Sequence, residues 1–81
     1  MSLEVTATLV NDETGFTFLT LAADDLPYMV LDRAETELRG HDRYAELKAA
    51  AEPAGDGTER LEVGTVTVTE DGSFEGLTVT A

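Results

Sequence analysis

Apolar and polar residues alternate in four segments of this chain, two near each end of the sequence. Such alternation sends successive side chains to opposite faces of a strand, so it predicts half-buried β-strands. The predicted strands cover residues 3–10, 16–22, 60–69 and 74–80. Turn-forming clusters separate the members of each pair, at Asn11 to Gly15 and at Glu70 to Ser73, and they indicate two β-hairpins.

The middle of the chain, residues 24–51, has a helical pattern instead. Its first apolar residues recur at steps of four, which places them on one stripe of a helix. They are Leu26, Val30, Ala34 and Leu38, with Leu31 beside them. Asp24 or Asp25 is placed to cap the N-terminus, with Pro27 in the first turn, where a missing N–H is tolerated.

The apolar stripe changes phase at Gly40, a residue type that often follows the last turn of a helix. Beyond it, a different face carries Tyr44, Leu47 and Ala51. We therefore expect a break over residues 40–42, with Asp42 capping a second short helix, and a single kinked helix is the alternative. A loop with proline and glycine over residues 52–57 ends the helical region.

These elements predict an α+β fold, a four-stranded antiparallel sheet in ββααββ order with one or two helices on one face. The length of 81 residues suits one domain, which we assign to residues 1–81. The strand order stays open, because the hairpins can join through the first strand, paired with the third or the fourth, or through the second. Residues 16–21 and 74–79 are weakly similar, either as a true repeat or as a chance match between β patterns.

Placing each hairpin on its turn divides the strand residues into two faces. One face carries the residues that we assign to the core beneath the helices: Leu3, Val5, Ala7, Leu9, Leu19, Leu21, Val66, Val68, Leu77, Val79 and Ala81. The opposite face carries mostly threonines, together with Val10, Phe16, Phe18, Leu61, Val63 and Phe74. Such a cluster of exposed apolar side chains indicates an interface, which we expect a second copy of the chain to cover. A register shifted by one residue would exchange the two faces and is the alternative.

Acidic residues dominate the composition. Aspartate and glutamate number 17 against 5 lysines and arginines, which gives a formal net charge of −12. Repulsion of that size destabilises a compact state in dilute buffer, whereas molar salt shortens the Debye length to about 3 Å and screens it. With a single lysine, Lys48, and many Thr, Ala and Val, the composition resembles that of proteins from salt-accumulating archaea. The resemblance implies a halophilic protein.

The same composition disfavours several kinds of partner. Cysteine is absent and His41 is the only histidine, so we expect neither a metal site nor a cofactor. Without a basic stripe, binding to nucleic acid or to an anionic membrane surface is disfavoured. The sequence has no signal-peptide pattern and no apolar stretch that could span a bilayer, so we expect a cytoplasmic protein.

Reactive side chains are concentrated only at residues 41–44, His-Asp-Arg-Tyr. A histidine beside a carboxylate can act as a general base, but sequence neighbours on a helix point in different directions. No nucleophile in a recognisable turn accompanies them, so we assign no catalytic residue. Carboxylates recur in the predicted turns without the spacing of a calcium loop, and we interpret them as solvated turns.

Three functions remain open. The first is a non-enzymatic protein-interaction or structural module, a homodimer or the small subunit of an assembly, with an unlike protein partner also open. The second is a domain that binds a small ligand on the aromatic face or between the helices and the sheet. The third is a small enzyme built around His41. We take the first as the prediction.

Overall fold

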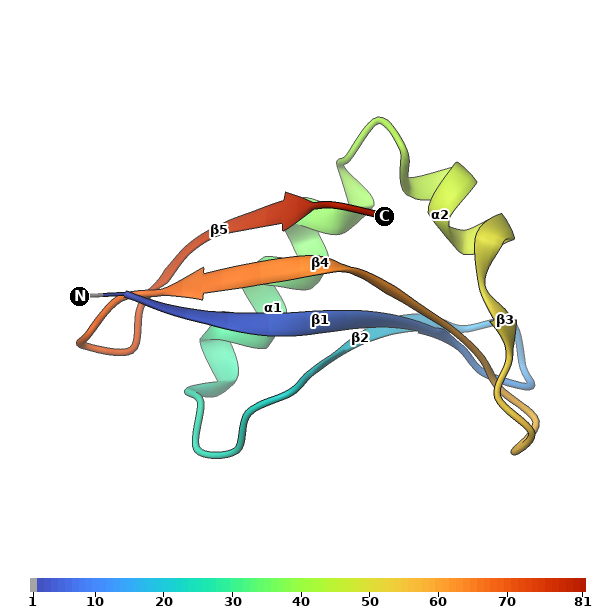
Figure 1. The fold of residues 1–81 in the computed structure, drawn as a ribbon, viewed down its shortest axis with the longest axis horizontal. Helices are drawn as coiled ribbons and strands as arrows, with labels where there is room; N and C mark the ends of the chain where they lie inside the picture. Colours follow the sequence, from blue (N-terminus) through green and yellow to red (C-terminus); the bar gives the residue numbers. More distant parts are fainter. Residues whose placement is uncertain (1) are drawn as a thin grey trace.

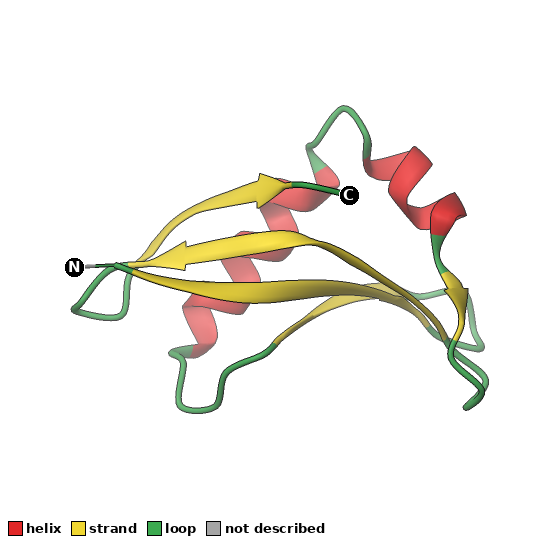
Figure 2. Ribbon diagram, viewed as in Figure 1, coloured by secondary structure: helices red, strands yellow, loops and turns green. Residues whose placement is uncertain are grey.

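The computed structural model of the chain describes residues 2–81, and Met1 lies outside the described part. Five strands form one antiparallel sheet, and two helices complete an α+β fold (Figures 1 and 2). In chain order the elements are β1 (Leu3–Asn11), β2 (Thr17–Leu21), α1 (Tyr28–Arg39), α2 (Tyr44–Ala50), β3 (Glu52–Pro53), β4 (Glu59–Val68) and β5 (Phe74–Val79). The sheet has one strand more than the sequence predicts, because the loop after the helices contributes the two-residue strand β3.

The two hairpins join through their first strands. β1 pairs with β4 along its whole length, β2 pairs with the other side of β1, and β5 pairs with the other side of β4. β3 lies on the same side of β4 as β5 and pairs only with Glu59 and Arg60. This is one of the orders that the sequence leaves open. It places the two weakly similar segments in the outer strands β2 and β5, as a pseudo-two-fold arrangement would.

The predicted break between two helices is confirmed, since α1 ends at Arg39 and α2 begins at Tyr44. The start of α1 differs from the prediction, because its N-cap is Pro27 rather than an aspartate. A residue before proline favours extended backbone, so Leu26 does not join the helix. Asp25, with a φ of 59°, turns the chain before it.

The core lies between the sheet and the helices. β1, β2, both helices and β4 contribute its buried members: Val5, Ala7, Leu9, Leu19, Val30, Ala34, Leu38, Leu47, Val63, Val66 and Val68. α1 crosses one face of the sheet and lies behind the strands in Figure 1, whereas α2 packs at one end through Leu47. Burial of each large apolar side chain contributes about 1.5–3 kcal/mol, so these contacts set the positions of the helices.

A β-bulge in β4 corrects the predicted face of two residues. Consecutive residues of β1 pair with Gly64 and Glu62, so Val63 is an extra residue in β4. Because a bulge shifts the alternation by one residue, the part of β4 before it turns its other side to the helices. Val63 is fully buried in the core and Leu61 packs against the core, although the sequence predicts both on the opposite face.

A second bulge corrects the predicted face of Phe74. Consecutive residues of β4 pair with Gly76 and Phe74, so Glu75 is an extra residue in β5. A regular two-residue hairpin would instead place Glu75 opposite Val68. Phe74 takes that position and packs against the core rather than facing away from it.

Candidate functional site

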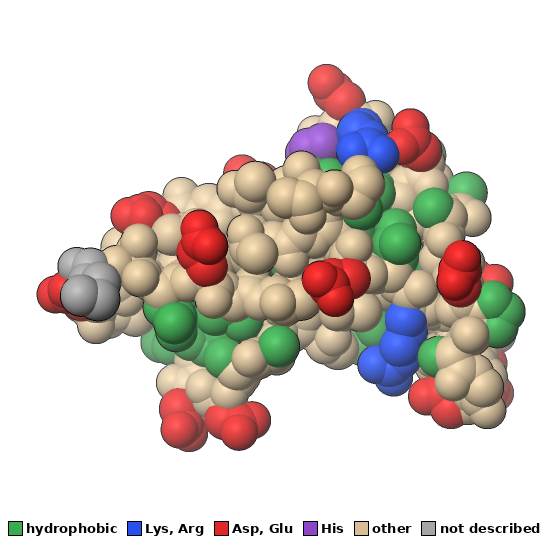
Figure 3. Space-filling model, in the orientation of Figure 1, with side chains coloured by type: hydrophobic (Ala, Val, Ile, Leu, Met, Phe, Trp, Pro, Cys, Tyr) green, Lys and Arg blue, Asp and Glu red, His purple; other side chains and the backbone are tan. Residues whose placement is uncertain are grey.

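The sheet face turned away from α1, which we call the outer face, carries the candidate interface. Its paired residues are Glu4, Thr6, Thr8 and Val10 of β1, Phe18 and Thr20 of β2, Glu52 of β3, Arg60, Glu62, Thr65 and Thr67 of β4, and Gly76 and Thr78 of β5. This face points toward the viewer in Figures 1 and 3. Of the predicted interface residues, Val10 and Phe18 lie on it and Phe16 lies beside it, in the turn before β2.

Two phenylalanines form the most exposed apolar part of this region. Phe18 lies opposite Val10 in the β1–β2 register, and the Phe16 ring stacks on Phe18 with a centroid distance of 6.0 Å and an interplanar angle of 24°. Val10 has no exposed surface, whereas Phe16 keeps 57% of its surface exposed. Stacked aromatic rings are stiff and apolar, so this pair presents a fixed contact surface to a partner.

The outer face carries a share of the negative charge that is in proportion to its number of residues. Its paired positions hold three carboxylates (Glu4, Glu52 and Glu62) and one guanidinium (Arg60), a sum of −2 out of the net charge of −12. In Figure 3 acidic side chains lie along the perimeter and also on the middle of this face, where they are separated by backbone and uncharged polar side chains. Two copies that met across this face would repel each other, so high salt would be needed to screen that repulsion.

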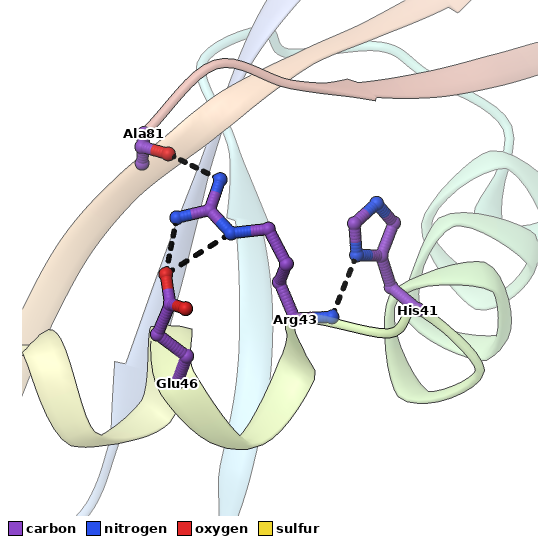
Figure 4. Close-up of polar contacts among 4 residues, drawn as sticks. All are labelled: His41, Arg43, Glu46 and Ala81. Carbon is purple, nitrogen blue, oxygen red and sulfur yellow. Dashed lines mark hydrogen bonds and ion pairs between the residues drawn. The ribbon is translucent and has the colours of Figure 1, made fainter.

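His41 bonds to the backbone just before α2. Its Nδ1 accepts a hydrogen bond from the backbone N–H of Arg43 at 3.1 Å (Figure 4). The N-cap of α2 is Arg43, and no side chain caps this helix, so the prediction that Asp42 caps it is wrong. The bond requires a neutral imidazole that carries its proton on Nε2.

Arg43 joins the start of α2 to the segment that follows β5. Its Nε donates to Glu46 Oε2 at 3.0 Å, and its Nη2 reaches the same carboxylate. Its Nη1 donates to the backbone oxygen of Ala81 at 2.6 Å (Figure 4). The polar groups around His41 thus hold a helix and the sheet together.

Asp12 uses its carboxylate to hold the turn between β1 and β2. Its Oδ1 accepts bonds from the hydroxyl of Thr14 at 2.7 Å, from the N–H of Thr14 at 2.9 Å and from the N–H of Phe16 at 2.9 Å. The Thr14 hydroxyl, followed by the Phe16 N–H, holds the pKa of Asp12 below its ordinary value. Asp12 thereby fixes the backbone that presents Phe16.

Two other turn aspartates behave in the same way. Asp56 accepts bonds from the hydroxyl and N–H of Thr58, and Asp71 accepts one from the hydroxyl of Thr69. These threonine hydroxyls are the main cause that lowers the pKa of each carboxyl. These three carboxylates thus accept hydrogen bonds from neighbouring groups of the chain. Residues 2–81 contain no group of three or more His, Asp or Glu that could hold a metal ion.

An open groove of about 860 Å³, which the sequence does not predict, lies between α2 and the adjoining ends of β1 and β4. Asn11 donates to the Lys48 carbonyl oxygen at 3.1 Å and to Glu59 Oε1 at 3.3 Å, and it accepts the Thr17 hydroxyl at 2.7 Å. Lys48 Nζ lies 5.3 Å from the ring centroid of Tyr44. The spacing of four residues between Tyr44 and Lys48 is the sequence signal that could have identified this pair.

Neither helix in the described part is long and apolar enough to cross a membrane. No family model matches the chain, and neither a curated protein nor a solved structure matches it. The geometry of the chain is therefore the guide to its function.

Proposed function

We propose that this protein is a non-enzymatic interaction module, adapted to high salt, that forms a homodimer through the outer face of its sheet. The observation that carries the proposal is the stacking of exposed Phe16 on half-buried Phe18, beside a threonine-rich surface of the sheet. Covering a large apolar side chain contributes about 1.5–3 kcal/mol. That amount is large beside the roughly 5–15 kcal/mol that stabilises a typical domain.

Two features favour a second copy over an unlike partner. A threonine-rich β surface can stack face to face on an identical surface, with the two sheets about 10 Å apart. A two-fold axis also lets Arg60 of each copy approach Glu62 of the other, because both lie on the outer face of β4. The Arg60 side chain keeps 45% of its surface exposed, so it is accessible for such a pair.

Sedimentation in molar KCl tests the proposal. We expect the wild type to be dimeric, and Phe16→Asp and Phe18→Asp to be monomeric with unchanged circular dichroism, because each places a charge on the contact surface. Met29→Asp is the matched control, since Met29 is 66% exposed on α1, away from the outer face, and should leave the dimer intact. A monomeric wild type, or a dimer that survives both phenylalanine substitutions, would refute the homodimer.

The groove beside α2 supports a second candidate, the binding of a small polar ligand. Its volume of about 860 Å³ lies within the roughly 300–1,000 Å³ typical of ligand pockets. Its lining combines the ammonium of Lys48 with carboxylates from Asp12, Glu13 and Glu59, so a zwitterion suits it better than an anion. Titration with a free amino acid should shift the amide resonances of Asn11 and Lys48 saturably, and unchanged resonances at high millimolar concentration would dismiss this candidate.

A further inference from the structure

The first half of β1 has a free edge. β2 pairs with β1 only from Ala7 to Asn11, and the chain then turns away after one further bond, from the Ala22 N–H to the Thr6 oxygen at 3.0 Å. Within the described residues, Leu3 to Val5 are paired only with β4, on the other side. Alternate residues of a strand direct their N–H and C=O groups to the same side, so the backbone groups of Glu4 point toward the free edge, as the Thr6 oxygen does.

An apolar pocket of about 290 Å³ opens where the chain leaves β1 after this last bond, between the end of β2 and the start of α1. It is lined by Leu21, Ala23, Asp25, Leu26, Pro27, Tyr28 and Leu31. Its apolar floor is continuous with the core, since Leu21, Leu26 and Leu31 pack against the core. Figure 3 shows this hydrophobic surface below the left half of the sheet.

The surroundings of the pocket are apolar and exposed to an unusual degree. Leu3 at the start of β1 keeps 54% of its surface exposed, and Tyr28 and Met29 at the start of α1 keep 80% and 66%. An unpaired strand edge beside exposed apolar residues is a template for another strand.

The charges around the pocket are negative. Glu4 on the free edge and Asp24 and Asp25 in the loop before α1 are all exposed. No lysine or arginine of the described chain lines the pocket. The nearest basic residue along α1, Arg33, lies over the ring of Phe74, at 5.9 Å from its centroid.

We infer that this site binds an extended peptide segment of an unlike protein. The segment adds a strand to the free edge of β1, places an apolar side chain in the pocket and sets basic side chains on the opposite side, against Glu4. In strand addition the backbone bonds provide affinity and the pocket provides specificity. The inference goes beyond the proposed homodimer, because it concerns a different partner and, apart from Glu4 and Thr6 of the outer face, different residues.

A second copy fits this edge poorly. Two-fold antiparallel pairing of two β1 edges around Glu4 would set Glu4 of one copy directly opposite Glu4 of the other. Like charges directly opposite each other across two strands are destabilising. A segment with basic side chains removes that repulsion and replaces it with attraction.

Titration of the ¹⁵N-labelled full chain with the capped peptide Lys-Val-Thr-Leu-Thr-Val-Lys tests the inference. Its alternation directs the apolar side chains toward the pocket and the lysines toward the side that carries Glu4. At the lowest salt concentration that keeps the chain folded, we expect saturable amide shifts confined to residues 2–6 and 21–31. The same peptide with glutamate in place of both lysines should not bind.

Two variants of equal net charge sharpen the test. Glu4→Lys should weaken binding of the lysine peptide by roughly threefold to tenfold, whereas Glu75→Lys, on the opposite edge of the sheet, should leave it unchanged. Phe16→Asp should bind like the wild type, which separates this site from the homodimer. The inference is overturned by the absence of saturation at millimolar peptide, by shifts centred on the outer face or the groove, or by equal binding of the glutamate peptide. Shifts at residues 3–5 that grow with protein concentration alone would assign the edge to a second copy and also overturn it.

Discussion

Gly64 is required by the close approach of β5. A Cβ built at Gly64 would overlap the backbone carbonyl of Thr78, and its φ of 158° is one that side chains rarely adopt. β5 cannot move away from this residue without breaking its backbone hydrogen bonds to β4. A glycine within a strand therefore marks the point where two backbones meet and the alternation changes.

Substitution of this glycine should be costly. We expect Gly64→Ala to lower the free energy of unfolding by at least about 2 kcal/mol, because the added methyl group has no space. Urea denaturation in molar KCl measures it. Gly76→Ala is the matched control in β5, where a Cβ would meet nothing within 4 Å, and it should be neutral or stabilising. Equal stability of the two variants would show that the bulge tolerates a side chain.

The turn aspartates predict a specific dependence on pH. The pKa of Asp12 is lowered in the folded chain, so its bonds contribute stability that is complete above the unfolded pKa, about 3.9. This contribution is lost as the pH falls through the folded value. We compare the two proteins in molar KCl, where charge repulsion is screened. Between about pH 5 and about pH 3, the melting temperature of the wild type should fall more steeply than that of Asp12→Asn.

The comparison needs a control, because protonation of other carboxylates relieves repulsion and acts in the opposite sense. Asp42→Asn removes an exposed aspartate that lies outside the three turns. It should keep the pH profile of the wild type, and a profile shared by all three proteins would contradict the role given to Asp12.

At the scale of the element, α1 protects the edge of β2. The N–H of Leu19 donates to Glu35 Oε2 of α1 at 2.9 Å, which occupies a donor that an edge strand would otherwise offer to another chain. We expect Glu35→Ala to destabilise the fold by roughly 1.5–3 kcal/mol, the usual worth of a hydrogen bond to a charged group. The hydrogen-exchange rate of the Leu19 amide should increase by more than the loss in global stability alone would cause.

Two further variants separate the bond from other effects. Glu35→Gln keeps an acceptor and should fall between the wild type and Glu35→Ala. Glu37→Ala removes an exposed glutamate from the same helix and should leave Leu19 exchange unchanged. Unchanged exchange at Leu19 in Glu35→Ala would rule out the protective bond.

The elements were predictable where the sequence pattern is uninterrupted. Alternation predicted the long strands, and the phase change at Gly40 predicted two helices. A five-residue loop over residues 11–15 predicts Leu19 opposite Ala7, which is wrong by two residues, because Leu19 pairs with Leu9. A shift of two residues nevertheless keeps every side chain on its predicted face. The bulges could not be predicted in this way, because each inserts one residue and reverses the faces beyond it, as Val63 shows.

The candidate sites were predictable only in part. Alternation placed Val10 and Phe18 on the outer face, because they lie in unbroken strand segments. The groove around Asn11 and the pocket around Tyr28 were missed, since both form where loops and helix ends meet strands from elsewhere in the chain. Such meetings depend on tertiary packing, which local periodicity does not describe.

At the scale of the whole molecule, charge governs stability. The described residues form two ion pairs between side chains, Arg43 with Glu46 and Arg60 with Asp56, against 17 acidic residues in the chain. We expect the melting temperature to rise strongly from dilute buffer to molar KCl, because the Debye length falls from about 10 Å at 0.1 M to about 3 Å at 1 M. Sucrose adds no ions, so at low ionic strength it should not produce the same rise in melting temperature as KCl. An equal or lower melting temperature in molar KCl would remove the case for a halophilic protein.

The screening of charge by salt also affects aggregation, because of a segment of β4 next to the bulge at Val63. Residues 63–69 read Val-Gly-Thr-Val-Thr-Val-Thr, without charge or proline, a composition typical of segments that form amyloid fibrils. In the folded chain β1 and β5 occupy both edges of this segment, and the bulge bends it away from the flat shape that fibril stacking needs. In an unfolded chain neither protection exists, and only the negative charge keeps such segments of different molecules apart. Molar salt, which we expect to stabilise the fold, should also remove that barrier to aggregation. The lifetime of the protein at high salt should then depend on how slowly it unfolds.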